Sequence, residues 1–177
     1  MKHYSPLLLK YLQQFQEDPT SKVFAPLSEA YRKIGLLDEA IEICKEGLAS
    51  NPDFIGGKVA LARACYDKKN YVEVYETLKP HIEKIPDNLL AQRLYADSCL
   101  ILGYLQEACI SYKLILYFNP TDKEAAALVD ELETQLYQTG GLLRGIRKPE
   151  KLRKIMKLQR LLNIVQKHKE RKSEQFQ

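Results

Sequence analysis

The chain has 177 residues, of which 45% are hydrophobic and 28% are charged, and its formal net charge at pH 7 is +4. This balance is typical of a folded globular protein and excludes an intrinsically disordered chain, which has few apolar residues for its charge. No run of about 18 apolar residues is present, so we expect no transmembrane helix. The apolar block at residues 6–9 is too short for the core of a signal peptide, and we expect a cytoplasmic protein.

The charge is distributed unevenly along the chain. Residues 144–177 contain 12 Lys or Arg and 3 Asp or Glu, an excess of +9, whereas residues 1–143 contain 15 basic and 20 acidic residues. A basic tail of this kind suits nucleic acid, a membrane surface or an acidic protein, and it also suits a solvated helix face. The choice among these depends on the fold of the acidic body.

The first predicted element covers residues 1–20. Its apolar residues recur at helical spacing and predict one amphipathic helix with a single buried face. The residues expected on that face are Leu7, Leu8, Tyr11, Leu12 and Phe15.

A repeat of 34 residues follows. Three prolines, Pro52, Pro86 and Pro120, are spaced 34 residues apart, and other positions match at the same period. Such a period is typical of stacked helical repeats. Within each unit the apolar spacing predicts two helices, and Pro26 places the start of the first one near Val23 or kinks it there. The matching sets are Leu27, Leu61 and Tyr95; Ser28, Ala62 and Ala96; Tyr31, Cys65 and Cys99; and Gly35, Lys69 and Gly103.

This pattern resembles the tetratricopeptide repeat, a 34-residue helix–turn–helix unit with small residues where the helices touch. Three units match, at residues 21–54, 55–88 and 89–122, in phase and without insertion. The resemblance implies an all-α fold, an α-solenoid of helix–turn–helix tetratricopeptide-like repeats, with residues 1–20 as an N-terminal capping helix. The departures from the family pattern are Lys58, Lys69 and Val74 in the second unit and Gln92 in the third.

Two elements are predicted after the repeats. Residues 123–139 form a C-terminal capping helix, with Thr121 or Asp122 as its N-cap and Gly140 and Gly141 at its end. Its expected buried residues are Ala125, Leu128, Val129, Leu132 and Leu136. Residues 140–148 are a linker, and residues 149–177 form a basic amphipathic helix. The charged face of that helix carries Arg153, Lys157, Arg160, Lys167 and Arg171.

Three interpretations of the basic helix remain open at this point. Its apolar side packs on the last repeat, or it contacts a partner protein or a second copy, or it lies on anionic lipid or phosphate backbones. No Trp or Phe anchors its apolar side, which favours the first two interpretations over a membrane or nucleic acid.

No pattern in the sequence predicts catalysis or metal binding. The four cysteines form no C-x-x-C pair and are expected to be buried and reduced, and the three histidines lie far apart in the sequence. The segment GGLLRG lacks the context of a phosphate-binding loop. We therefore expect no enzyme, no metal and no cofactor. The cysteines are Cys44, Cys65, Cys99 and Cys109.

The resemblance implies a binding surface, because the first helix of each unit lines the concave face of such a solenoid. The mixture of Arg, Tyr and apolar residues there suits a partner segment with apolar and acidic groups. Ala25 and Glu29 replace the Lys and Asn with which some relatives grip a chaperone carboxylate. The expected partner-binding residues are Glu29, Arg32, Lys33, Arg63, Tyr66, Arg93, Asp97 and Leu100.

The sequence thus predicts a non-enzymatic adaptor or scaffold that binds a partner protein in this groove, with the basic helix as a cap or second contact. The alternative is a peripheral membrane- or nucleic-acid-associated regulator that docks through the basic helix. An enzyme would need a perturbed titratable cluster, and the sequence contains none. The partner's identity and the oligomeric state are left open.

Overall fold

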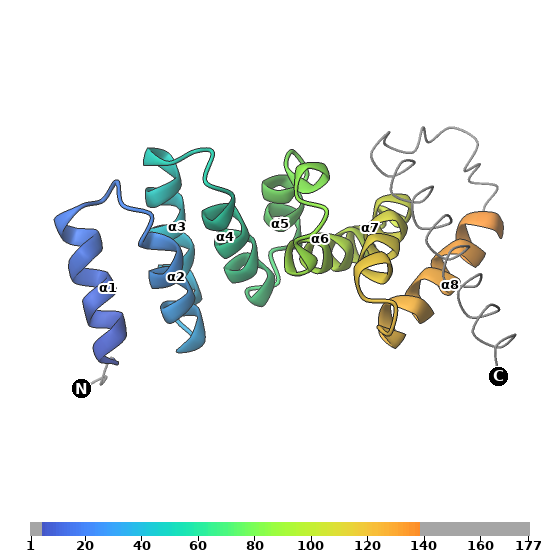
Figure 1. Cartoon of the computed structure of the whole chain (residues 1–177), viewed down its shortest axis with the longest axis horizontal. Coiled ribbons are helices and arrows are strands. Elements are labelled where there is room, and N and C mark those ends of the chain that lie inside the picture. The colour runs from blue at the N-terminus through green and yellow to red at the C-terminus, as the bar shows by residue number, and fades with distance from the viewer. Residues whose placement is uncertain (1–4, 139–177) are drawn as a thin grey trace, which may run out of the picture. The chain divides into compact units, whose positions relative to one another are not determined.

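A computed structural model describes residues 5–138, and Figure 1 shows how its helices follow one another. These residues form helices only, with no strand among them, so the predicted all-α fold is confirmed. The predicted linker at 140–148 and basic helix at 149–177 lie outside the described residues. The elements are α1 (Pro6–Glu17), α2 (Phe24–Lys33), α3 (Leu37–Ser50), α4 (Ile55–Asp67), α5 (Tyr71–Leu78), the 3-10 helix η1 (Ile82–Lys84), α6 (Leu89–Leu102), α7 (Leu105–Phe118) and α8 (Lys123–Gln138).

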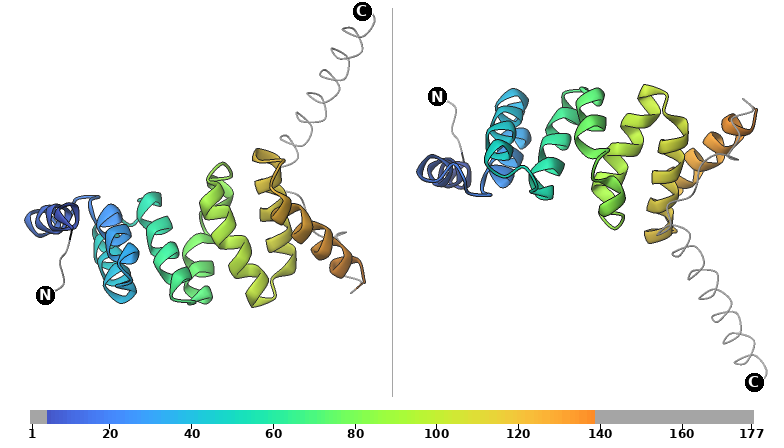
Figure 2. Two further views of the ribbon diagram at one scale, coloured as in Figure 1. Left: turned by 90° about the horizontal axis from the view of Figure 1, so that it is seen from below. Right: turned by 90° about the horizontal axis from the view of Figure 1, so that it is seen from above.

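The helices pair in chain order, as a solenoid requires. Helix α2 packs on α3, α4 on α5, and α6 on α7, while α1 contacts α2 and α8 contacts α7. The first helices of successive pairs also meet, since α2 contacts α4 and α4 contacts α6. Figure 2 shows the same succession from two opposite sides. Each pair therefore buries its apolar residues against its neighbours, which is how repeat proteins build a continuous core.

Helix α1 is set by its first residues. The Ser5 hydroxyl accepts a hydrogen bond from the Leu8 backbone N–H at 3.2 Å, and a proline occupies the first turn. Leu8 and Phe15 are buried as predicted, but Leu7 is 55% exposed, so its assignment to the buried face was wrong. Helix α1 packs against α2. One packed helix buries fewer residues of α1 than the five that the apolar spacing predicts.

The turns inside the units share one backbone conformation. Gly35 and Gly103 have φ angles of +81° and +82°, in the left-handed region that glycine adopts without strain. Lys69, at the equivalent position of the second unit, has a φ of 63°. Helix α2 begins at Phe24, so Pro26 lies in the first turn, where its missing N–H would have no partner, and the predicted start near Val23 is confirmed.

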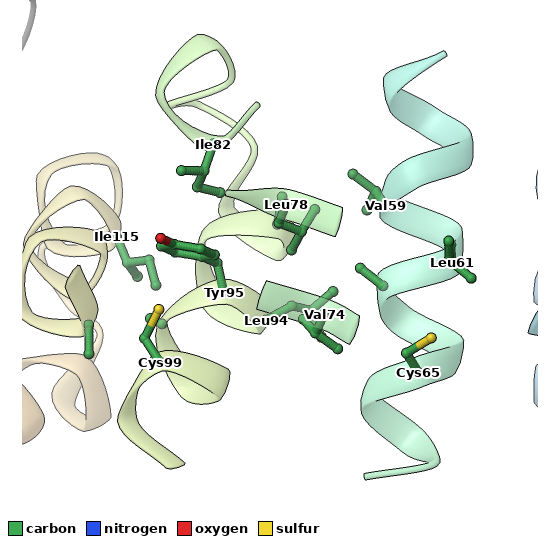
Figure 3. Close-up of a cluster of buried hydrophobic side chains, with 14 of the residues drawn as sticks. Val59, Leu61, Cys65, Val74, Leu78, Ile82, Leu94, Tyr95, Cys99 and Ile115 are labelled. Atoms are coloured by element: carbon green, nitrogen blue, oxygen red, sulfur yellow. The ribbon is translucent and has the colours of Figure 1, made fainter. Parts of the chain in front are cut away.

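The core runs through the units along the helix contacts. The small residues predicted at these contacts, Ser28, Ala62 and Ala96, are at most 1% exposed. In Figure 3, Val59 of α4 and Leu78 of α5 point toward each other. All four cysteines are buried and free, as expected, and burial raises the pKa of the Cys44, Cys65 and Cys99 thiols to about 11, about 11 and about 12. At neutral pH these thiols stay protonated and act as small apolar groups.

Candidate partner-binding face

The first helices of the units carry a row of mostly polar side chains, with contacts across each junction between successive first helices. It starts on α2, crosses α4 and α6, and ends at the beginning of α8. We call this surface the first-helix face. It consists of Glu29, Arg32, Lys33, Arg63, Tyr66, Asp67, Arg93, Asp97, Leu100, Asp122 and Glu124.

Between the first two units, Arg32 is the centre of the contacts. Its Nε and Nη2 atoms donate to the two carboxylate oxygens of Glu29 at 2.8 and 2.7 Å, and its Nη1 pairs with Asp67. Arg63 reaches the same Glu29 Oε1 at 3.1 Å. The hydrogen bond from Arg32 lowers the pKa of Glu29, and the bond to Glu29 raises the pKa of Arg32. One carboxylate therefore serves two guanidinium groups across the unit junction.

Between the second and third units, Asp97 takes the equivalent place. Its Oδ2 accepts from the Tyr66 hydroxyl at 3.0 Å, and its Oδ1 accepts from the Tyr112 hydroxyl at 2.6 Å. Burial and the Asp97 charge raise the pKa of Tyr66 to about 12, and the same causes raise the pKa of Tyr112. Both phenols stay protonated at neutral pH and act as donors to the carboxylate.

At the end of the row, Arg93 joins the third unit to α8. Its Nη2 pairs with Asp122, its Nη1 lies 3.5 Å from Glu124, and its guanidinium carbon lies 5.8 Å from the centre of the Tyr112 ring. Asp122 also accepts a hydrogen bond from the Ala125 N–H at 2.9 Å, and this bond, followed by Arg93, lowers the pKa of Asp122. The predicted start of this helix at Asp122 is confirmed.

Six of the eight predicted partner-binding residues take part in these hydrogen bonds and ion pairs, and two do not. Lys33 is exposed in the last turn of α2, where its charge contributes to lowering the pKa of Glu29. Leu100 is half-buried and packs against the core. Their role in partner binding stays a prediction. The five basic residues predicted at the tail, Arg153, Lys157, Arg160, Lys167 and Arg171, lie outside the described residues.

Beside the first unit junction lies a hollow of about 560 Å³. The Phe54 ring packs edge-on against Phe24 with a centroid separation of 5.7 Å, and the Lys22 Nζ lies 5.2 Å from the Phe54 centroid. Phe54 lies at the N-cap of α4, the first helix of the second unit. The lining residues are Lys22, Asn51, Pro52, Asp53, Phe54, Ile55 and Gly56.

A second row of ion pairs joins the second helices of the units, and sequence reasoning missed it. Lys45 of α3 pairs with Glu73 of α5 at 2.9 Å, and Lys79 of α5 lies 3.5 Å from Glu107 of α7. Both the lysines and the glutamates are spaced by 34 residues, so a search for charges at the repeat period would have found them. The row ends differently, because Lys113 pairs with Glu133 of α8.

The part of the chain that the structure describes contains no group of three or more His, Cys, Asp or Glu that could hold a metal ion. Within residues 5–138, no helix has both the length and the apolar character that crossing a membrane requires.

Comparison with known proteins finds a similar family model and a similar fold. Residues 31–98 match the family model for the tetratricopeptide repeat. A solved structure of MamA AMB-1 aligns with 80% of this chain and 78% of its own length, with a TM-score of 0.67 and 22% sequence identity. At this identity the likeness shows a shared fold. No curated protein matches the chain.

Proposed function

We propose that the chain is a non-enzymatic adaptor or scaffold that binds a segment of a partner protein on its first-helix face, because residues 31–98 match the tetratricopeptide family model. The basic segment 149–177 provides a cap or a second contact in this proposal. The resemblance to repeats that bind other proteins and the shared fold support the general role.

One observation carries the proposal. Polar contacts join successive first helices at each of the three junctions from α2 to the start of α8, and exposed apolar side chains lie on α6, one of these helices. Leu90 is 41% exposed and Ile101 is 54% exposed, while the Arg63 side chain is 37% exposed. Arginine, tyrosine and apolar side chains together are typical of protein–protein interfaces. The face thus offers both polar and apolar contacts to a partner.

The alternative function depends on the +9 charge excess of residues 144–177. In that case the chain is a regulator that docks through its basic residues onto anionic lipid or nucleic acid. Binding of this type would fall steeply as salt rises, because it depends on long-range attraction and counterion release.

The two functions are separated by capture from native lysate with the full chain and three variants. The first is Arg63→Glu on the first-helix face. The second replaces the five tail cations Arg153, Lys157, Arg160, Lys167 and Arg171 by Gln. The third, Lys10→Glu, changes an exposed residue of α1 and serves as the charge-matched control for the face variant.

The adaptor proposal expects one protein that is captured by the full chain and by the control, and is lost with Arg63→Glu. The tail variant then weakens capture without abolishing it. Capture that survives Arg63→Glu and disappears with the tail variant would overturn the adaptor proposal and leave the basic segment as the functional element.

A further inference from the structure

We propose that the first-helix face selects a partner segment whose charges are separated into two blocks, one acidic and one basic. The acidic block meets the α2–α4 end and the basic block meets the α6–α8 end. This inference rests on the proposed function and specifies the chemistry of the partner.

The α2–α4 end has an excess of positive charge. Arg32, Lys33 and Arg63 stand against Glu29 and Asp67, which leaves one uncompensated cation. Arg63 approaches Glu29 through its Nη1 atom alone, at 3.1 Å, so among the described residues its other guanidinium N–H groups have no carboxylate partner. Lys33 is exposed to solvent. An acidic group of a partner would find both cations accessible.

The α6–α8 end has the opposite excess. Arg93 and the exposed Lys123 are the cations of this end, and the acidic residues are Asp97, Asp122, Glu124 and the exposed Glu131 of α8, which leaves an acidic excess. The Glu124 side chain is 78% exposed and lies 3.5 Å from Arg93, so this carboxylate is only weakly held. Asp97 receives its hydrogen bonds from two neutral phenols, which leave its charge uncompensated. A basic group of a partner would be attracted to this end.

The spacing of the helices sets the length of the segment. Packed helices lie about 8–10 Å apart, so two helix steps separate the ends by about 20 Å. A helical segment spans this distance in about 13 residues and an extended one in about 6 residues. A partner whose positive and negative charges alternate over this length would be attracted and repelled about equally at each end of the face. A partner with separated blocks gains at both ends, since complementary charges attract and like charges across an interface are costly.

The test uses two fluorescein-labelled 16-residue peptides of identical composition, each with four Glu, four Lys and eight Ala. In the block peptide the Glu and Lys residues occupy opposite thirds, and in the interleaved peptide they alternate. Fluorescence anisotropy measures binding of each peptide to the full chain at low salt. We expect the block peptide to bind about tenfold more tightly, in either chain direction.

Charge reversals assign this preference to the face. Lys33→Glu and Glu124→Lys each change an exposed residue at one end and should weaken the block peptide by about fivefold, while the interleaved peptide changes little. The matched controls are Lys10→Glu on α1 and Glu46→Lys on α3, which make the same changes in net charge outside the face. The controls should leave both peptides unchanged, and circular dichroism checks that each variant keeps its helices.

Equal binding of the two peptides would overturn the inference. So would an equal response to the face variants and to the controls, because that response follows from net charge or from the basic tail. If lysate capture still depends on Arg63 while the block preference is absent, the proposed function stands and the charge inference fails. If neither capture nor peptide binding depends on the face, both fail.

Discussion

The second repeat unit differs from the first and third in its second helix. Helix α5 has 8 residues, whereas α3 and α7 have 14 each. Pro80 is the cause, since proline lacks the N–H that would continue the helix and its ring clashes with the preceding turn. The chain instead leaves the helix after Leu78 and forms the short η1 turn.

The third unit compensates for this break. Gln92 of α6 is fully buried, and its Nε2 donates to the backbone oxygens of Ile82 and Ile85 at 3.1 and 3.3 Å. Tyr95 and Tyr104 stack on Tyr75 of α5, with centroid separations of 5.6 and 4.7 Å. A departure in one repeat unit is thus stabilised by its neighbour, because adjacent units share one core.

The largest expected effect concerns Gly47, a buried position of α3 at which the Phe24 ring packs against the helix backbone. Gly47, His81 and Ile115 are equivalent by the 34-residue period. A Cβ at Gly47 would lie 2.1 Å from the Phe24 ring, so the ring must move. We expect Gly47→Ala to lower the free energy of unfolding by about 3 kcal/mol, measured by urea denaturation.

The double variant Gly47→Ala with Phe24→Leu is the control. The smaller side chain makes room for the added methyl, so the two changes together should cost less than the sum of the single changes. Strict additivity would show that the ring contact is not the reason for the loss.

The second prediction concerns the compensation itself. Gln92→Met keeps the approximate size of the side chain and removes both hydrogen bonds to the broken segment. Removing the donor from the buried Ile82 oxygen should cost about 1–2 kcal/mol in the free energy of unfolding, whereas the Ile85 oxygen keeps the Asn88 N–H at 3.2 Å. Gln106→Met is the matched control, since Gln106 on α7 is half-buried and makes no side-chain hydrogen bond. A similar effect of the two changes would contradict the assigned role of Gln92.

Much of the fold follows from the sequence because the 34-residue period fixes the number and phase of the helices. The same period identifies Ser28, Ala62 and Ala96 as contact positions, and their burial confirms it. The early end of α5 could also have been predicted, since Pro80 lies in the second half of its unit and cannot continue a helix. The sequence marked Gln92 as a departure, but its role depends on the position of the Ile82 and Ile85 carbonyl groups after α5, which residue spacing alone does not determine.

The sequence predicted which residues lie on the candidate face, but it did not predict which partners their side chains contact. The repeat register placed Arg32, Arg63 and Arg93 on the first helices, and we expected them to meet an acidic partner. The structure pairs all three with carboxylates from this chain. Which neighbours they reach depends on side-chain directions across unit junctions, and residue spacing alone does not determine those directions.

The third prediction compares the turn between the two helices of the second unit with the same turn in the first and third units. Lys69 adopts the left-handed conformation that its equivalents Gly35 and Gly103 adopt without strain. Lys69→Gly should therefore raise the free energy of unfolding by up to about 1 kcal/mol, whereas Gly103→Ala should lower it by about 1 kcal/mol. Space is not an obstacle at Gly103, where a Cβ would meet no atom within 4 Å. Opposite signs for the two substitutions, measured by thermal unfolding, would establish backbone strain as the difference, and equal signs would refute it.

The smallest expected effect is the pH dependence that comes from His81, the one histidine of the three repeat units. His81 lies where Gly47 and Ile115 are buried, and its Nε2 lies 2.5 Å from the Lys58 Nζ. Burial, followed by the charges of Lys58 and Lys84, lowers the pKa of His81, against a smaller opposite contribution from Asp53. The folded state therefore favours neutral His81. Its contribution to stability is fully present above the ordinary histidine pKa of about 6.5 and is lost as the pH falls through the lowered value. Urea denaturation at pH 7.5 and pH 5 should show a smaller loss of stability on acidification for His81→Gln than for the unchanged chain, and identical losses would disprove the coupling.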